Sequence, residues 1–344
     1  MEAPFLEKQK YSENESLQCQ PEEEYKYHVY TAIYIIVFVF GVLFNGAAIY
    51  VFCIANKKKG ISSICLMNLA YADLIFIIFL PLRISYYVSG ASWIFGDILC
   101  RITTFTFYFS MYSSIYFLAC LTMFRYLSVV FSGKIYVKKV VWLCAFIWVF
   151  TAISTTPFLT SGSYVRENKT RCFEPSGVSS WKIIMHMNYY ALSVGFILPF
   201  LSVVIFNSLL IKHILQIPMS RRNIRKQVTM IVLVLLVYTL CFLPYHIQRT
   251  IHLHYLVHHP NICSLHDILQ RTVVATLCLA VLNSCLDPLF YIFVGHGFKS
   301  WFQIMCGSKN MLQKEPSMSN SDEVDKVTMD EIQMNDEILI NNNV

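Results

Sequence analysis

Several side chains suited to chemistry stand inside stretches of the chain that are otherwise apolar. Asn45, Asp73, Arg125 and Asp287 each lie within such a stretch. A charge deep in hydrocarbon costs at least about 2.5–3.5 kcal/mol, so these groups are expected to face the interior of a helix bundle and to function there.

Prolines interrupt three apolar stretches, at Pro199, Pro244 and Pro288, and Trp148 lies in the fourth stretch of the chain. A proline removes a helix hydrogen bond and is tolerated in a membrane only where neighbours re-satisfy the backbone. One polar or kinking residue in most stretches indicates a bundle that moves, which favours a receptor over an enzyme.

The lengths of the apolar stretches predict the fold. The chain of 344 residues is 56% hydrophobic and 14% charged, whereas soluble proteins average about 25% charged residues. Runs of about 20 apolar residues cross the roughly 30 Å of a bilayer core. We predict spans at 29–54, 63–88, 98–131, 139–160, 184–214, 226–253 and 268–294. The fold class is an all-α membrane protein, a seven-transmembrane helix bundle over 29–295.

Basic residues predict how this bundle is oriented. They follow spans 1 and 3 and precede span 6: Lys57, Lys58, Lys59, Lys134, Lys138, Lys139, Arg221, Arg222, Arg225 and Lys226. The positive-inside rule makes that side cytoplasmic, with the N-terminus outside, in a multi-pass plasma-membrane protein. Residues 1–28 then form an acidic extracellular tail without a cleavable signal peptide. The glycosylation sequons at Asn14 and Asn168 both fall outside. The formal net charge of +6 belongs to the loops, so we predict no nucleic-acid partner.

Cysteines also divide between the two sides. Four fall outside, where disulfides persist: Cys19, Cys100, Cys172 and Cys263. Four cysteines allow three connectivities, and sequence alone does not choose among them. Their positions favour Cys100 with Cys172, which leaves Cys19 with Cys263. The cysteines inside the spans are interpreted as buried thiols: Cys53, Cys65, Cys120, Cys144, Cys241, Cys278 and Cys285.

The outer halves of the spans combine cations with aromatic rings. Arg83 lies ten residues after Asp73, about 15 Å further out along a helix, and Arg249 and His252 lie in the outer part of span 6. Arginine suits bidentate recognition of a carboxylate or phosphate, so an anionic, partly apolar ligand is predicted. An arginine near a span end can instead extend to lipid headgroups, and we assign Arg271 to that role. Tyrosines that can supply hydroxyls and ring faces are Tyr86, Tyr87, Tyr108 and Tyr245.

An ordered set of motifs carries a family resemblance over residues 28–306. The motifs are Asn45 in Gly-Val-Leu-Phe-Asn, Leu69-Ala70-Tyr71-Ala72-Asp73, Phe124-Arg125-Tyr126, Trp148, Pro199, Cys241-Phe242-Leu243-Pro244 and Asp287-Pro288-Leu289-Phe290-Tyr291. Together they resemble the rhodopsin-like, class A G-protein-coupled receptors. The resemblance implies a heterotrimeric G protein as partner.

Three further stretches resemble the cysteinyl leukotriene receptors, type 1 most closely. They are Trp93–Asp97, Lys169–Pro175 and Pro244–His254. This resemblance implies an anionic lipid ligand whose head group meets Arg83, Tyr108 and Arg249. It also implies signalling through Gq/11 and calcium first, and through Gi second.

Two other readings compete with this one. A nucleotide receptor, or an orphan receptor of the same branch, is the alternative, because His246 and Arg249 fit the His-x-x-Arg signature of nucleotide receptors. Those receptors usually carry a Gln or Lys and an Arg in span 7, where this chain has Val274 and Leu277. An enzyme is not expected, since no His-Glu-x-x-His or Gly-x-Ser-x-Gly motif occurs.

Four oxygen-bearing residues are expected to converge near the centre of the bundle: Asp73, Ser114, Asn283 and Asp287. Two carboxylates and two neutral oxygens suit a hard cation, so an allosteric sodium ion is the one metal predicted, and no other cofactor is. The alternative is a hydrogen-bonded cluster with one carboxylate protonated.

The resemblance also implies an activation switch formed by Arg125, Tyr126, Phe242, Pro244, Pro288 and Tyr291. The chain departs from the superfamily at three positions. Phe124 replaces the acidic neighbour of Arg125, Phe242 replaces the common Trp of helix 6, and Asn207 stands where span 5 usually carries a Tyr. Other polar contacts are therefore expected to hold Arg125 in the inactive state.

The last part of the chain is expected to lie in the cytoplasm. Residues 296–306 resemble the short interfacial helix of the family, with Cys306 as a palmitoylation candidate. Residues 307–344 are predicted to be a disordered tail. Its candidate sites for receptor kinases, and hence for arrestin, are Ser317, Ser319 and Ser321.

Overall fold

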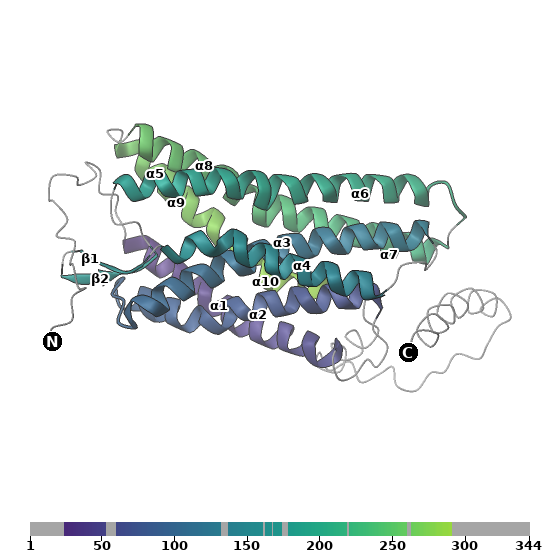
Figure 1. Cartoon of the computed structure of the whole chain (residues 1–344), viewed down its shortest axis with the longest axis horizontal. Coiled ribbons are helices and arrows are strands. Elements are labelled where there is room, and N and C mark those ends of the chain that lie inside the picture. The colour runs from purple at the N-terminus through teal and green to yellow at the C-terminus, as the bar shows by residue number, and fades with distance from the viewer. Residues whose placement is uncertain are drawn as a thin grey trace, which may run out of the picture.

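The computed structural model describes residues 24–52, 60–131, 137–160, 162–166, 168–173, 178–218, 220–259 and 263–290. Within these residues, seven helical segments are long and apolar enough to cross a membrane. They lie side by side in an elongated bundle (Figure 1). The predicted seven-helix bundle is therefore confirmed.

Each of the first three spans is one helix, and the other four are composite. The first three are α1 (Glu24–Tyr50), α2 (Ile61–Val88) and α3 (Gly96–Val130). Span 4 is α4 (Val137–Thr155) continued by η3 (Thr156–Thr160), and span 5 is α5 (Val178–Tyr190), η4 (Ala191–Ile197) and α6 (Leu198–Ile214). Span 6 is α7 (Arg221–Leu236), η5 (Val237–Phe242) and α8 (Leu243–His258), and span 7 is α9 (Cys263–Val281) with α10 (Asn283–Leu286).

Several helices begin five or six residues before their predicted spans, as α5 does at Val178, α7 at Arg221 and α9 at Cys263. Helix α1 begins at Glu24, within the segment predicted to be a tail, because Tyr25 and Tyr27 pack against the core and extend the helix. The predicted interfacial helix at 296–306 and the tail at 307–344 lie outside the described residues.

Pro199 explains the irregular turn in span 5. The segment η4 is π-helical, and the Leu198 N–H bonds to the Ser193 carbonyl five residues earlier. In that register the Val194 carbonyl would bond to residue 199, but proline has no N–H. The Tyr116 hydroxyl of α3 donates to the Val194 carbonyl instead, at 2.8 Å.

Pro288 creates the same need in span 7. Its missing N–H leaves the Ser284 carbonyl, four residues earlier, without a helical donor. Asn45 Nδ2 of α1 donates to that carbonyl at 2.9 Å and to the Gly41 carbonyl at 3.2 Å. This contact explains why span 1 carries an amide.

A short hairpin covers one end of the bundle, which we call the hairpin end. Strands β1 (Tyr164–Arg166) and β2 (Lys169–Arg171) pair antiparallel, and Asn168 is exposed in the turn between them. The predicted disulfide between Cys100 and Cys172 is present and ties the hairpin to α3. Cys263 is disulfide-bonded, whereas Cys19, its predicted partner, and the sequon at Asn14 lie outside the described residues. We call the opposite end, where α7 begins, the Arg125 end.

A side-chain hydrogen bond joins α2 to α4 at mid-bundle. Trp148 Nε1 donates to Asn68 Oδ1 at 2.8 Å. The ring of Trp148 also packs against Phe109 and Phe117 of α3. Trp148 therefore links three helices through one side chain.

Replacing Trp148 with Phe keeps an aromatic ring but leaves Asn68 Oδ1 without its donor. An unpaired buried acceptor costs about 1–3 kcal/mol, so the thermal midpoint of the detergent-solubilised protein should fall below that of the unmodified protein. Trp142→Phe is the matched control, because the Trp142 side chain on the same helix is 76% exposed. Equal midpoints for the two variants would contradict the role of this bond.

Candidate functional site

Arg83 of α2 is buried beneath the hairpin end, with only 5% of its surface exposed. Its guanidinium lies 4.6 Å from the ring centroid of Phe107 and 4.2 Å from that of Phe173. One nitrogen donates to the Thr103 carbonyl at 3.2 Å, and Nε has no hydrogen-bond partner among the described residues. The cation is thus held by rings and one carbonyl.

Arg249 of α8 approaches the same region from the other side of the bundle. Its guanidinium lies 5.4 Å from the ring centroid of Tyr108 and 5.8 Å from that of Tyr245. Tyr108 follows Phe107 in α3, and their rings meet edge to face with centroids 5.1 Å apart. Arg83 and Arg249 are therefore connected through two adjacent aromatic residues.

Neither arginine has a carboxylate partner in the part of the chain that the structure describes. The ion pairs there join Arg101 to Asp97 and Arg271 to Asp267. Arg271 is also 4.8 Å from the ring centroid of Tyr25. Arg83 is buried and Arg249 is partly buried. A buried cation without a counter-ion is expensive, so the chemistry of this pair suits an anion.

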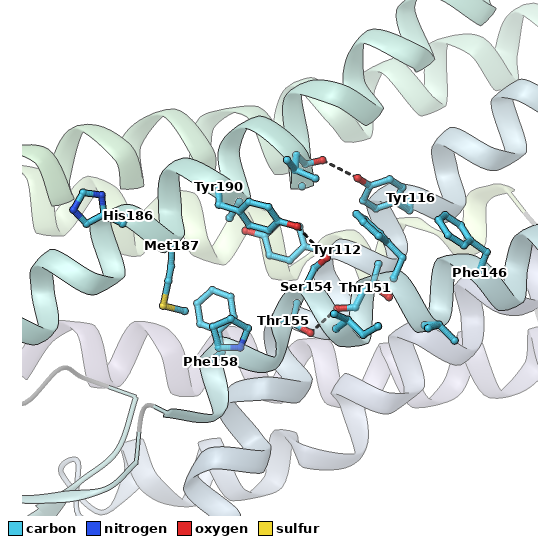
Figure 2. Close-up of a pocket in the computed structure, with 17 residues that line it drawn as sticks. Tyr112, Tyr116, Phe146, Thr151, Ser154, Thr155, Phe158, His186, Met187 and Tyr190 are labelled. Carbon is cyan, nitrogen blue, oxygen red and sulfur yellow. Dashed lines mark hydrogen bonds between the residues drawn. The ribbon is translucent and has the colours of Figure 1, made fainter.

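The structure also contains an apolar cavity of about 620 Å³. It is lined by α3, α4, η3, α5 and η4, and Figure 2 shows its walls. Side chains of Phe146, Val149 and Ile153 line it and are exposed on the outside of α4, so the cavity opens toward lipid. The Ser154 and Tyr190 hydroxyls meet across it, 3.2 Å apart (Figure 2).

Tyr108 connects the cationic site to the cavity. Its ring stacks on Phe158 of η3, with centroids 3.7 Å apart, and Phe158 lines the cavity. The two sites can therefore receive one molecule with an anionic head and an apolar tail.

The structure brings most of the predicted ligand residues together, although their burial and their contacts differ. Tyr245 is fully buried, and its hydroxyl has no hydrogen-bond partner among the described residues. His252 lies three residues beyond Arg249 on α8 and is partly buried. Sequence reasoning missed Phe158 and the α4–α5 cavity, because those side chains look like ordinary lipid-facing residues.

The predicted oxygen cluster is present at the centre of the bundle. Asp73 Oδ1 accepts from Ser114 at 3.4 Å and from Ser284 at 2.9 Å. Asn283 Nδ2 donates to Asp287 Oδ2 at 3.4 Å. Sequence reasoning missed Ser284, although its place three residues before Asp287 was a usable signal.

Arg125 is held by span 6 at the opposite end of the bundle. Its guanidinium donates to Gln227 Oε1 and, at 3.3 Å, to the Gln227 carbonyl. Phe124, which replaces the usual acidic neighbour, is buried. Gln227 thus supplies the polar restraint on Arg125 that sequence analysis expected but did not locate.

Of the other predicted switch residues, Tyr126 lies beside Arg125 on α3, Phe242 ends η5, and Pro244 lies in α8. The Tyr126 ring packs on Phe206, with centroids 5.8 Å apart, and Phe242 is fully buried. Asn207 is 3% exposed, and neither its Oδ1 nor its Nδ2 has a hydrogen-bond partner among the described residues. Tyr291 lies outside them, as do Cys306, Ser317, Ser319 and Ser321.

Comparison with known proteins agrees with this geometry. The chain is 39% identical to cysteinyl leukotriene receptor 2 of Sus scrofa over 80% of this chain and 81% of the relative. It is 37% identical to cysteinyl leukotriene receptor 1 of Sus scrofa over 80% and 84%, so types 1 and 2 match about equally. It is also 34% identical to the human uracil nucleotide/cysteinyl leukotriene receptor over 85% and 80%.

The family match covers most of the bundle. Residues 44–291 match the family described as 7 transmembrane receptor (rhodopsin family). The matched segment includes Asp73, Arg125 and Arg249, which the structure places at its three polar sites. The chain therefore belongs to the rhodopsin family of seven-transmembrane, G-protein-coupled receptors, and within it is homologous to the cysteinyl leukotriene receptors.

Proposed function

We propose that this receptor responds to an anionic lipid mediator, with the cysteinyl leukotrienes as first candidates. The observation that carries the proposal is Arg83, a buried guanidinium without a carboxylate in the described part of the chain, joined through aromatic contacts to an apolar cavity. The head of the ligand binds Arg83 and Arg249, with Tyr108, Tyr245 and His252 around it. The tail occupies the α4–α5 cavity.

The orientation of the bundle follows from chemistry at its two ends. The Cys100–Cys172 disulfide lies at the hairpin end, and disulfides persist outside the cytoplasm. Exposed basic residues begin α7 at the other end: Arg221, Arg222 and Arg225. The N-terminus and hairpin end are therefore extracellular, the Arg125 end and the C-terminus are cytoplasmic, and the membrane is the plasma membrane. Asn168, exposed in the hairpin turn, is then accessible for glycosylation.

Span 6 connects the two ends. Arg249 and Gln227 lie on it 22 residues apart, about 33 Å along a helix. An anion that draws Arg249 inward acts on the same span that holds Arg125 through Gln227. A ligand that binds better when span 6 has moved outward shifts the population toward that state. The opened cavity at the Arg125 end then admits a G protein of the Gq/11 class, with Gi second, and receptor kinases and arrestin act later.

A nucleotide is the competing ligand, because one relative carries uracil nucleotide in its name. A nucleotide also presents phosphates that two arginines can bind. The cavity argues for a lipid, since Phe146, Val149 and Ile153 offer no hydrogen bonds to a base or ribose. Calcium mobilisation measured with both kinds of ligand distinguishes the lipid from the nucleotide.

The central oxygen cluster is proposed as an allosteric sodium site. Asp73 Oδ2 and Asp287 Oδ1 are buried and accept no hydrogen bond from a described donor. The two carboxyl groups interact directly with each other, so a hard cation can bind between them. Ser114 and Asn283 complete the oxygen set, and Ser284 adds a fifth donor. Sodium at this site binds the inactive bundle and opposes activation.

The first test is calcium mobilisation in transfected cells challenged with cysteinyl leukotrienes and a panel of nucleotides. Arg249→Ala should weaken the leukotriene response about tenfold or more, since a hydrogen bond to a charged group contributes about 1.5–3 kcal/mol. Arg271→Ala is the matched control, because Arg271 is paired with Asp267. A response to nucleotides alone, at confirmed surface expression, would overturn the lipid assignment.

Gln227→Ala should raise signalling without ligand. The variant loses one hydrogen bond to the Arg125 guanidinium, about 1.5–3 kcal/mol, so the active fraction should rise about tenfold or more. Gln227→Glu should hold basal signalling at or below the unmodified level, since it pairs two charges. The exposed Gln216 gives a control as Gln216→Ala. Basal inositol phosphate accumulation measures all three, and equal values for Ala and Glu would contradict the restraint.

Replacing sodium with choline should raise agonist affinity in the unmodified receptor, because sodium favours the inactive bundle. The expected change is about 5-fold or more, the low end of typical allosteric coupling. Asp73→Asn should abolish this sodium dependence. Ser113→Ala is the control, since Ser113 faces Thr151 of α4 rather than Asp73. Radioligand competition in sodium and in choline measures the agonist affinity of each variant. Sodium dependence that persists in Asp73→Asn would contradict the proposed site.

A further inference from the structure

Three thiols meet between α2, α3 and α4 in a part of the bundle that the proposed signalling mechanism does not use. The Sγ atoms of Cys65, Cys120 and Cys144 all lie within 4.8 Å of one another. Those of Cys65 and Cys120 are 3.8 Å apart. The three residues are 1%, 5% and 3% exposed, so this thiol cluster is enclosed by protein.

The cluster is held by three separate helices that are fixed to one another. Each helix contributes one thiol, and Trp148, one turn beyond Cys144, bonds to Asn68, three residues beyond Cys65. The three cysteines belong to the largest apolar core of the bundle. In the described part of the chain no His, Asp or Glu joins this group of ligand atoms.

The spacing suits one metal ion bound by three sulfurs. A metal–sulfur bond is about 2.3 Å long, so three sulfurs around a trigonal ion lie about 4.0 Å apart. Zinc in structural sites takes four ligands, and the cluster offers three. Thiolates without oxygen or nitrogen ligands select soft ions such as copper(I). We propose that Cys65, Cys120 and Cys144 form a three-coordinate site for a soft monovalent cation of the copper(I) class.

The charge balance agrees with a monovalent ion. Binding releases protons from the thiols it engages. A monovalent ion that displaces one proton leaves one thiolate, two thiols and no net charge, which a low-dielectric core tolerates. The displaced proton is released to solvent, as in other metal–thiolate sites.

Access and redox state depend on the orientation given under the proposed function. With the Arg125 end in the cytoplasm, the thiols meet a reducing compartment that keeps them from forming disulfides. The identity of the extracellular ligand does not enter, so failure of the leukotriene assignment would leave this site untouched.

The test titrates the purified full-length receptor, kept reduced with a phosphine, with silver(I) as a redox-inert probe and with copper(I) buffered by a chromogenic chelator. One ion per chain is expected, with sulfur-to-metal absorption in the ultraviolet and a raised thermal midpoint. Cys120→Ser keeps the size of the side chain but removes a soft ligand. Its affinity should fall more than the 10–100-fold typical for losing an outer-shell partner.

Cys278→Ser is the matched control, because Cys278 is also a free buried thiol but lies outside the cluster. Cys144→Ala gives a second variant should Cys120→Ser fail to yield monodisperse protein. Unchanged copper(I) affinity in a folded cluster variant, or binding proportional to all free thiols, would mean an adventitious ion only. Zinc binding as tight as copper(I) binding would overturn the three-coordinate assignment.

Discussion

Lipid offers no water to a carbonyl that a proline has released, and this constraint organises the bundle. The Val194 carbonyl, whose π-helical donor would be residue 199, is satisfied instead by Tyr116 from α3. The Ser284 carbonyl, released by Pro288, is satisfied by Asn45 from α1. Each irregular helix is thus tied to a straight neighbour by a side chain that reaches its weak point. At both places a neighbouring helix supplies the donor that proline lacks, so the irregular turn keeps these two carbonyls paired.

The same constraint applies to the charged side chains. Among the described residues, Arg83 is held by a carbonyl and two rings, Arg125 by Gln227, and Asp73 by two hydroxyls. None of these three partnerships cancels the charge. Such partial satisfaction keeps the resting bundle folded, and it leaves each site with capacity for an ion or a partner of opposite charge.

Sequence reasoning predicted those features that depend on one residue type in one place. Asp73, Arg125 and the prolines were recognised because lipid rejects them. The Cys100–Cys172 pair was favoured because both cysteines lie on the outer side, one at the start of span 3 and the other in the loop after span 4. Ser284, Gln227 and Phe158 were not, since serine, glutamine and phenylalanine are ordinary at span positions. Their roles arise only when helices distant in sequence meet. A few motifs likewise could not decide between type 1 and type 2, because the chain is nearly equally identical to both receptors.

Asn207 shows how a buried polar side chain without a hydrogen-bond partner affects the stability of one arrangement of the bundle. Its buried amide, unpaired among the described residues, raises the free energy of the described arrangement by about 1–3 kcal/mol. Any state in which the amide finds a donor or an acceptor recovers this amount. The unpaired amide therefore reduces the free-energy difference between the described arrangement and any arrangement that pairs it. At this position, an unpaired amide lowers the stability of the described arrangement and favours any arrangement that pairs it.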